Sequence, residues 1–302
     1  MYIIIFSLFI NLIFGQVLTD NSFNTSRAVS LAGATVSNPG KLESIFYNPA
    51  YLPSVKTTTF LVGKTNFYEI DFLKYSYFSF IYSGNKITPK SNFALTIQEL
   101  GTKPAYSNVQ NYLSIERAIT LSKGYSFFQD RNSSLSIGFN LNYLMLEQGR
   151  SAGPSGDGSD GFPSEKITAY GIDIGLYATL RGKVMMGAFI KNMNSPSLGN
   201  GKNSHYLPRR LNIGFSYMPM KKLKTSFEFQ RSMGSKNNQF RVAILYDLFK
   251  NFTFRAGAQL KPNRFGTGFT FDLDDRVIFS YGLITHPVMP LTHNFEVGFS
   301  TK

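Results

Sequence analysis

The chain of 302 residues contains no cysteine, no tryptophan and few charged residues. The absence of cysteine excludes a disulfide scaffold, thiolate metal sites, a cysteine nucleophile and a lipid anchor on an N-terminal cysteine. Charged residues make up 16% of the chain, whereas ordinary soluble domains contain ~25%. A soluble protein of this size would need more charge to cover its surface, so the composition favours a protein whose outer surface is apolar.

Long apolar segments are missing after residue 15. No later segment reaches the ~18 consecutive apolar residues of a transmembrane helix, which excludes a helical membrane protein. Residues 1–15 contain an apolar run from Tyr2 to Phe14, which has the length of a signal-peptide core and is too short to span a bilayer. This segment has no Lys or Arg, so the amino terminus alone supplies positive charge. We expect a signal peptide at residues 1–15, and a buried N-terminal strand is the alternative.

Aromatic and basic residues are abundant instead. The chain has 29 Phe and 17 Tyr, and its net charge is +13. Lys and Arg concentrate near predicted turns, for example at Lys221, Lys222 and Lys224. Basic turns can bind nucleic acid, or they can bind anionic lipid head groups and lipopolysaccharide. Because secretion would remove the chain from cytosolic nucleic acid, we expect outer-membrane lipid and lipopolysaccharide as partners and no nucleic acid.

Alternation of apolar and polar residues dominates residues 57–302 and is typical of strands with two unlike faces. In one example, Phe252, Phe254 and Ala256 alternate with Thr253 and Arg255. Such segments number about fourteen, with centres near residues 60, 79, 95, 117, 139, 172, 187, 214, 227, 243, 256, 269, 280 and 296. This spacing fits membrane strands of ~9–11 residues joined by turns. We therefore predict an all-β fold, an antiparallel transmembrane β-barrel of about fourteen strands over residues 57–302.

Two long connections, at residues 148–165 and 192–207, are rich in Gly, Ser, Asn and Pro. Outer-membrane barrels keep their longer loops on the extracellular side, so we place both loops there and the protein in the outer membrane of a Gram-negative bacterium. A soluble β-sandwich or propeller is the alternative, because its strands also alternate. The polar face is mostly Gly, Ser, Asn and Thr, which suits the lumen of a barrel better than a solvated sheet.

Residues 16–56 precede the first strand and have a different character. A stretch of small residues from Ala28 to Ala34 is followed by the motif Tyr47, Asn48, Pro49 and Ala50. Pro49 is unsuited to a central strand, and Asn48 can close a turn with its own side chain. A barrel of this width needs material inside it or it leaks. We predict that residues 16–56 form a plug in the lumen with this motif at its packed centre, and a periplasmic linker is the alternative.

The N-terminal motifs also resemble those of a known family. The stretch Ser26-Arg27-Ala28, continued by Leu31 to Ala34, and the motif at residues 47–50 resemble the FadL-like superfamily of outer-membrane barrels, especially its PorV/PorQ branch. The tail from Phe254 to Phe295 looks like the last four strands of that branch. The resemblance implies a fourteen-stranded barrel with an N-terminal plug. It also implies a role either in uptake of hydrophobic molecules or in type IX protein secretion.

Residues with catalytic or metal-binding chemistry are few. No triad follows for the histidines at positions 205, 286 and 293, since the strand neighbours of His293 point to opposite faces. The Gly-rich residues 149–161 lack the ending of a phosphate-binding loop. Asp157 and Asp160 supply too few oxygen ligands for calcium. We expect no enzymatic activity, no cofactor and no metal.

Arg117 is a charge on a face that is otherwise predicted to meet lipid. In a regular strand it would share that face with Ile115, Ile119 and Leu121. Because a charge in lipid is costly, we predict a local bulge or kink that turns Arg117 inward.

Two functions remain open from the sequence. The first is a PorV/PorQ-like component of, or accessory to, type IX protein secretion and surface attachment, with secretion-complex proteins as partners. The second is FadL-like transport of a hydrophobic small molecule across the outer membrane. Only two loops are long, which leaves little material for an elaborate outer ligand pocket. The sequence therefore favours the first.

Overall fold

The computed structural model describes residues 23–83, 91–102, 113–151, 153–155, 159–199, 204–234, 238–274 and 276–301. The expected signal peptide at residues 1–15 lies outside this part of the chain. Among the described residues, no helix has the length and apolar character needed to cross a membrane.

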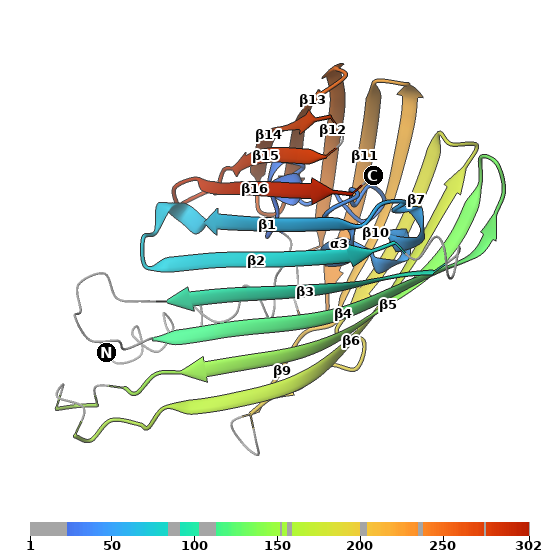
Figure 1. Cartoon of the computed structure of the whole chain (residues 1–302). Helices are drawn as coiled ribbons and strands as arrows, with labels where there is room; N and C mark the ends of the chain where they lie inside the picture. The colour runs from blue at the N-terminus through green and yellow to red at the C-terminus, as the bar shows by residue number, and fades with distance from the viewer. Residues whose placement is uncertain are drawn as a thin grey trace.

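The described residues form a closed antiparallel barrel of fourteen strands (Figure 1). The strands are β1 (Thr59–Asn66), β2 (Leu73–Tyr82), β3 (Ser91–Thr102), β4 (Ser114–Gln129), β5 (Ser134–Gln148), β6 (Glu165–Leu180), β7 (Val184–Lys191), β10 (Arg210–Met220), β11 (Leu223–Ser232), β12 (Gln239–Phe249), β13 (Phe252–Leu260), β14 (Arg264–Leu273), β15 (Val277–Ile284) and β16 (Thr292–Ser300). Pairing of β1 with β16, which sets Thr59 opposite Ser300, closes the barrel. The predicted barrel is confirmed, and every expected strand centre falls inside one of these strands.

Each strand has two unlike faces, because its side chains alternate between the lumen and the outside. On β13, for example, Phe254 points outward and is 38% exposed, whereas Arg255 points inward and is 1% exposed. The same alternation recurs around the barrel, so that a band of Phe, Leu, Ile and Val side chains covers its outer face. Because the outer face is apolar, the low proportion of charged residues in the chain is explained.

The two ends of the barrel differ in the length of their connections. At one end, here called the short-turn end, neighbouring strands are joined by tight connections at residues 130–133, 181–183, 221–222 and 250–251. The other end, called the long-loop end, carries the connections from Gln148 to Glu165 and from Lys191 to Arg210. The second of these contains a small separate sheet of β8 (Ser197–Leu198) and β9 (His205–Tyr206).

Strands β4, β5 and β6 are the longest of the barrel, and β6 extends beyond β7 at the long-loop end. They contain 16, 15 and 16 residues, whereas β7 contains 8. The register between β6 and β7 begins at Ile174, so residues 165–173 of β6 run past the end of β7. Figure 1 shows these strands reaching farther than β10 to β16. Since ~9–11 residues suffice to cross a bilayer, one side of the barrel is taller than a membrane requires.

Candidate functional site in the barrel lumen

Residues 23–56, here called the N-terminal segment, lie inside the barrel. The segment forms α2 (Ser26–Ser30), α3 (Ser44–Tyr47) and the short helix η1 (Pro49–Ser54), and nearly all of its residues are buried. Figure 1 shows it in blue within the ring of strands. A 3-10 turn, η2 (Phe67–Glu69), follows β1 at the long-loop end. The structure thus puts the region expected to form a plug in the lumen, from Phe23 onward.

Glycines on the inner face let the backbone of the N-terminal segment touch the wall. A Cβ atom at Gly138 would overlap the backbone of Pro49 and Ala50, and one at Gly187 would overlap Val36. Similar contacts occur at Gly257, at Gly266 of β14 and at Gly282 of β15. Because only glycine leaves room for such close approach, the wall is shaped to the segment along several strands.

Glu228 on β11 binds the backbone of the N-terminal segment. Its Oε2 atom accepts hydrogen bonds from the backbone N–H groups of Thr35 at 2.7 Å and Val36 at 2.8 Å. Its Oε1 atom lies 3.2 Å from a guanidinium nitrogen of Arg241, which also donates to the carbonyl oxygen of Gly33 at 3.1 Å. Both side chains are almost fully buried. A buried charge needs a partner and hydrogen bonds. The two side chains are each other's partner, and the backbone of the segment supplies further hydrogen bonds.

Glu296 on β16 makes a second attachment of the same kind. It accepts hydrogen bonds from the backbone N–H of Ser26 at 2.6 Å and from the hydroxyl of Ser26 at 2.5 Å, at the start of α2. The hydroxyl of Tyr77 donates to the same carboxylate at 2.5 Å. A carboxylate at a helix start satisfies N–H groups that have no partner within the helix. Glu228 and Glu296 therefore hold the segment at two points on one side of the lumen.

The motif Tyr47, Asn48, Pro49 and Ala50 lies where the segment crosses to β5 and β6. The side-chain amide of Asn48 donates to the carbonyl oxygens of Val36 at 3.0 Å and Leu176 at 2.9 Å, and its own oxygen accepts from the N–H of Ala50 at 3.1 Å. The Tyr47 hydroxyl lies 2.9 Å from that of Thr25, and burial raises the pKa of Tyr47 well above its usual range. All four motif residues are buried.

An apolar patch faces the lumen on the opposite side, toward the long-loop end. Its inward side chains come from β3 to β6 and from the connection between β7 and β10. They form one cluster with Leu42, Ile45 and Phe46 of the N-terminal segment. The residues of the patch are Leu100, Ala118, Leu144, Leu146, Ala169, Leu198 and Leu207. The buried Glu116 lies on the same face of β4. In the structure, this part of the lumen is filled by packed apolar side chains.

Arg117 does not turn inward, and the predicted bulge at this position is wrong. Along the described residues of β4, the register is regular past Arg117 on both sides and shifts only between Ser126 and Phe128. Arg117 points outward and forms ion pairs with Glu99 at 2.7 Å and Glu147 at 3.4 Å, and Glu147 also pairs with Lys166. The charge is tolerated on the outer face because these partners neutralise it near the long-loop end.

The histidines do not converge with each other. His205 lies in the exposed strand β9, and His286 is hydrogen-bonded to the backbone of its own loop. The imidazole of His293 lies 2.7 Å from the hydroxyl of Tyr281 and 3.1 Å from Glu69 on the outer side of the barrel. Within the described ranges, no group of three or more His, Cys, Asp or Glu residues could hold a metal ion.

Comparison with known proteins identifies the fold. Neither a protein-family model nor a curated protein matches the sequence. Among solved structures, the chain is similar to the CymD monoaromatic hydrocarbon channel (12% identity, TM-score 0.62), covering 93% of this chain and 98% of that one. It is similar to the Ralstonia pickettii toluene transporter TbuX (12%, 0.58), covering 93% and 100%, and to a Pseudomonas aeruginosa FadL homologue (11%, 0.56), covering 92% and 98%. The chain therefore has the fold of a FadL-like barrel.

Sequence reasoning did not find the carboxylates that hold the N-terminal segment. Alternation places Glu228 and Glu296 on the polar side of their strands, but it places many Ser, Thr and Gly residues there as well. Their charge could have identified them, since an inward acid in the middle of a membrane strand must have a partner.

Proposed function

We propose that this protein is an outer-membrane barrel that takes up a hydrophobic small molecule. The observation that carries the proposal is the apolar patch, which lines the lumen at the long-loop end and continues into the N-terminal segment. A molecule leaving water would gain ~25 cal/mol per Å² of apolar surface buried there. The similar structures are channels and transporters, and two of them are named for hydrocarbon or toluene. This supports transport over the type IX secretion role that the sequence favoured.

The proposal assigns an orientation and a role to each part of the chain. Residues 1–15 direct secretion and are removed, the long-loop end faces the cell exterior because outer-membrane barrels carry their longer loops there, and the short-turn end faces the periplasm. The N-terminal segment acts as a plug. Its buried hydrogen bonds to Glu228 and Glu296 keep the resting lumen closed to ions, while the apolar patch above it receives the ligand.

Uptake of radiolabelled toluene by cells with an intact outer membrane tests this function. Cells that produce the wild-type protein should accumulate the probe faster than cells with an empty vector. Replacing Leu144 and Leu146 together with Gln should slow uptake by at least about tenfold, since each leucine offers ~1.5–3 kcal/mol of apolar contact. Ser134→Gln, at the other end of the same strand, is the control and should leave uptake unchanged. Equal rates with the wild type and the empty vector would rule out transport of this probe.

A further inference from the structure

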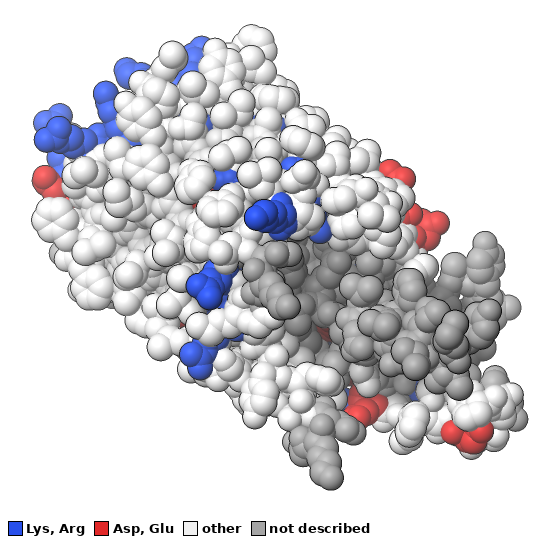
Figure 2. All heavy atoms as spheres, turned by 180° about the vertical axis from the view of Figure 1, so that it is seen from behind, with Lys and Arg blue, Asp and Glu red and all other residues white. Residues whose placement is uncertain are grey.

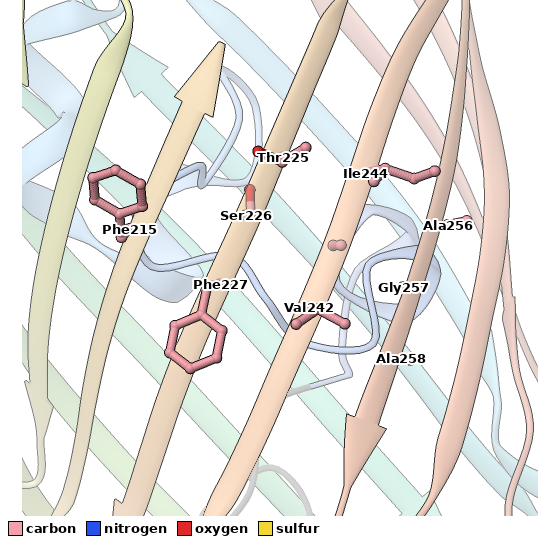
Figure 3. Close-up of a pocket in the computed structure, with 10 residues that line it drawn as sticks. Phe215, Thr225, Ser226, Phe227, Val242, Ile244, Ala256, Gly257 and Ala258 are labelled. Atoms are coloured by element: carbon pink, nitrogen blue, oxygen red, sulfur yellow. The ribbon is translucent and has the colours of Figure 1, made fainter. Parts of the chain in front are cut away.

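A groove runs along the outer face of β10 to β13. It has a volume of about 520 Å³, and its lining includes Phe215, Phe227, Val242, Ile244, Ala256 and Ala258. Figure 3 shows the two phenyl rings on one side of the groove, the aliphatic side chains of β12 beside them and the small residues of β13 on the other side. The small alanines create the depression and the larger side chains frame it. Its walls are largely apolar, which suits a hydrocarbon chain.

Basic residues gather at the short-turn end of the same strands. Lys221 and Lys222 form the turn between β10 and β11, and Lys250 lies in the turn between β12 and β13. All three are exposed, and none forms an ion pair with a described residue. Asp247 lies close by in sequence, but it alternates to the inner face and accepts a hydrogen bond from Thr253. Figure 2 shows blue side chains gathered along one edge of the molecule, at its short-turn end.

The distance between the groove and the lysines fits within the depth of one membrane leaflet. Ile244 pairs with Thr225, three residues from Lys222, which is about 10 Å along a strand. Half of the hydrocarbon core of a bilayer is ~15 Å thick. Tyr217 and Tyr246 point outward between the groove and the turns, where the amphipathic rings of membrane proteins prefer the interface. The order along the strands is therefore apolar groove, tyrosine belt and cationic rim.

From this arrangement we propose that the groove and the three lysines bind an anionic phospholipid of the periplasmic leaflet. One acyl chain lies in the groove, and the phosphate group meets Lys221, Lys222 and Lys250. A second groove of about 360 Å³ on the neighbouring strands, which Leu176 and Met186 help to line, repeats the pattern above Arg181 and Lys183. The site depends on the membrane orientation proposed above but not on transport of any ligand.

Native mass spectrometry of the protein in mild detergent, with added phosphatidylglycerol or phosphatidylethanolamine of identical acyl chains, tests the proposal. The wild type should retain phosphatidylglycerol at least about fivefold better, since lysines near the membrane surface attract anionic head groups. Changing Lys221, Lys222 and Lys250 together to Gln should remove this preference. The matched control changes three exposed cations of the long-loop end, Lys74, Arg150 and Arg231, to Gln and should keep it.

A groove-filling variant separates the acyl-chain site from a general charge effect. Ala258→Phe places a ring in the groove from outside the barrel and should lower retention of both phospholipids by at least about threefold, with heat-dependent gel migration confirming a folded barrel. Equal retention of the two phospholipids by the wild type would overturn the proposal. Equal loss of preference in the two triple variants would overturn it too, as would unchanged retention in Ala258→Phe. If the wild type takes up no toluene but still prefers phosphatidylglycerol, the result would count against the transport function alone.

Discussion

Opposite sides of the lumen contact the N-terminal segment through different kinds of interaction. The side formed by β10 to β16, here called the polar wall, offers buried carboxylates and guanidinium groups, among them Glu228, Arg241 and Glu296, and hydrogen-bonds to backbone atoms of the segment. The apolar patch on β3 to β6 contacts apolar side chains of the same segment. Hydrogen bonds between buried groups require fixed geometry, whereas apolar contacts are not directional. The polar wall therefore holds residues 26–36 by directional bonds, and Asn92 of β3 holds Leu52 and Val55 in the same way at 2.7 Å, whereas the contacts with the apolar patch are not directional.

The largest effect, on ion conductance through the lumen, should come from removing most of the N-terminal segment. Deletion of residues 24–50 should leave a barrel that still inserts into membranes but conducts ions in planar bilayers, because a barrel of fourteen strands is too wide for its own side chains to fill. The current should exceed that of the intact protein by orders of magnitude. If the intact and deleted proteins conduct alike, the segment does not close the lumen.

Neutralising a carboxylate of the polar wall should cost the most stability of any single substitution considered. Glu228→Gln leaves the buried charge of Arg241 without its partner, and breaking a buried pair costs ~3–5 kcal/mol. Urea unfolding in detergent micelles measures the loss. Glu147→Gln, which removes a half-exposed acid from the outer face, is the matched control and should cost less than ~1 kcal/mol. Similar stability of the two variants would show that the polar wall does not hold the segment by charge.

A smaller loss of stability is expected when a glycine of the wall that touches the backbone of the N-terminal segment is replaced. Gly187→Ala adds a methyl group where the backbone of Val36 lies against the wall, and overpacking of this kind costs ~1–3 kcal/mol. Gly101→Ala, on the outer face of β3 with no atom within 4 Å of the added Cβ, serves as the comparison. Midpoints of urea unfolding that shift equally for the two variants would mean that the segment does not press on the glycines.

The smallest effect should come from the outer side of the tall strands. Arg117→Gln removes ion pairs whose side chains are 38% and 47% exposed for Arg117 and Glu99, and such pairs contribute at most ~1 kcal/mol. The expected change in unfolding free energy is therefore well below that of Glu228→Gln. A loss as large as that of the buried pair would place Arg117 in the hydrocarbon layer and not near the long-loop end.

Local patterns predicted the barrel well and the interactions of individual charges poorly. Alternation has a period of two residues, so Phe254 and Arg255 could be assigned to opposite faces from the sequence. Alternation alone places Arg117 on the outer face, where the structure has it, but the predicted bulge turned it inward and was wrong. Its neutralising partners, Glu99 and Glu147, come from two other strands. The sequence of a single strand does not show which residues of the neighbouring strands will lie beside it.

The number of strands, their inward and outward faces and the difference between short turns and long loops could be predicted from the sequence, because each depends on residues adjacent in the chain. The tertiary structure decided how residues 23–56 are held. Glu228 meets Thr35 and Val36, and Glu296 meets Ser26, across sequence separations that only closure of the barrel by β1 and β16 brings together. The motif at Asn48 shows the same limit, since its turn was predictable whereas its hydrogen bond to Leu176 depends on the wall that the fold places beside it.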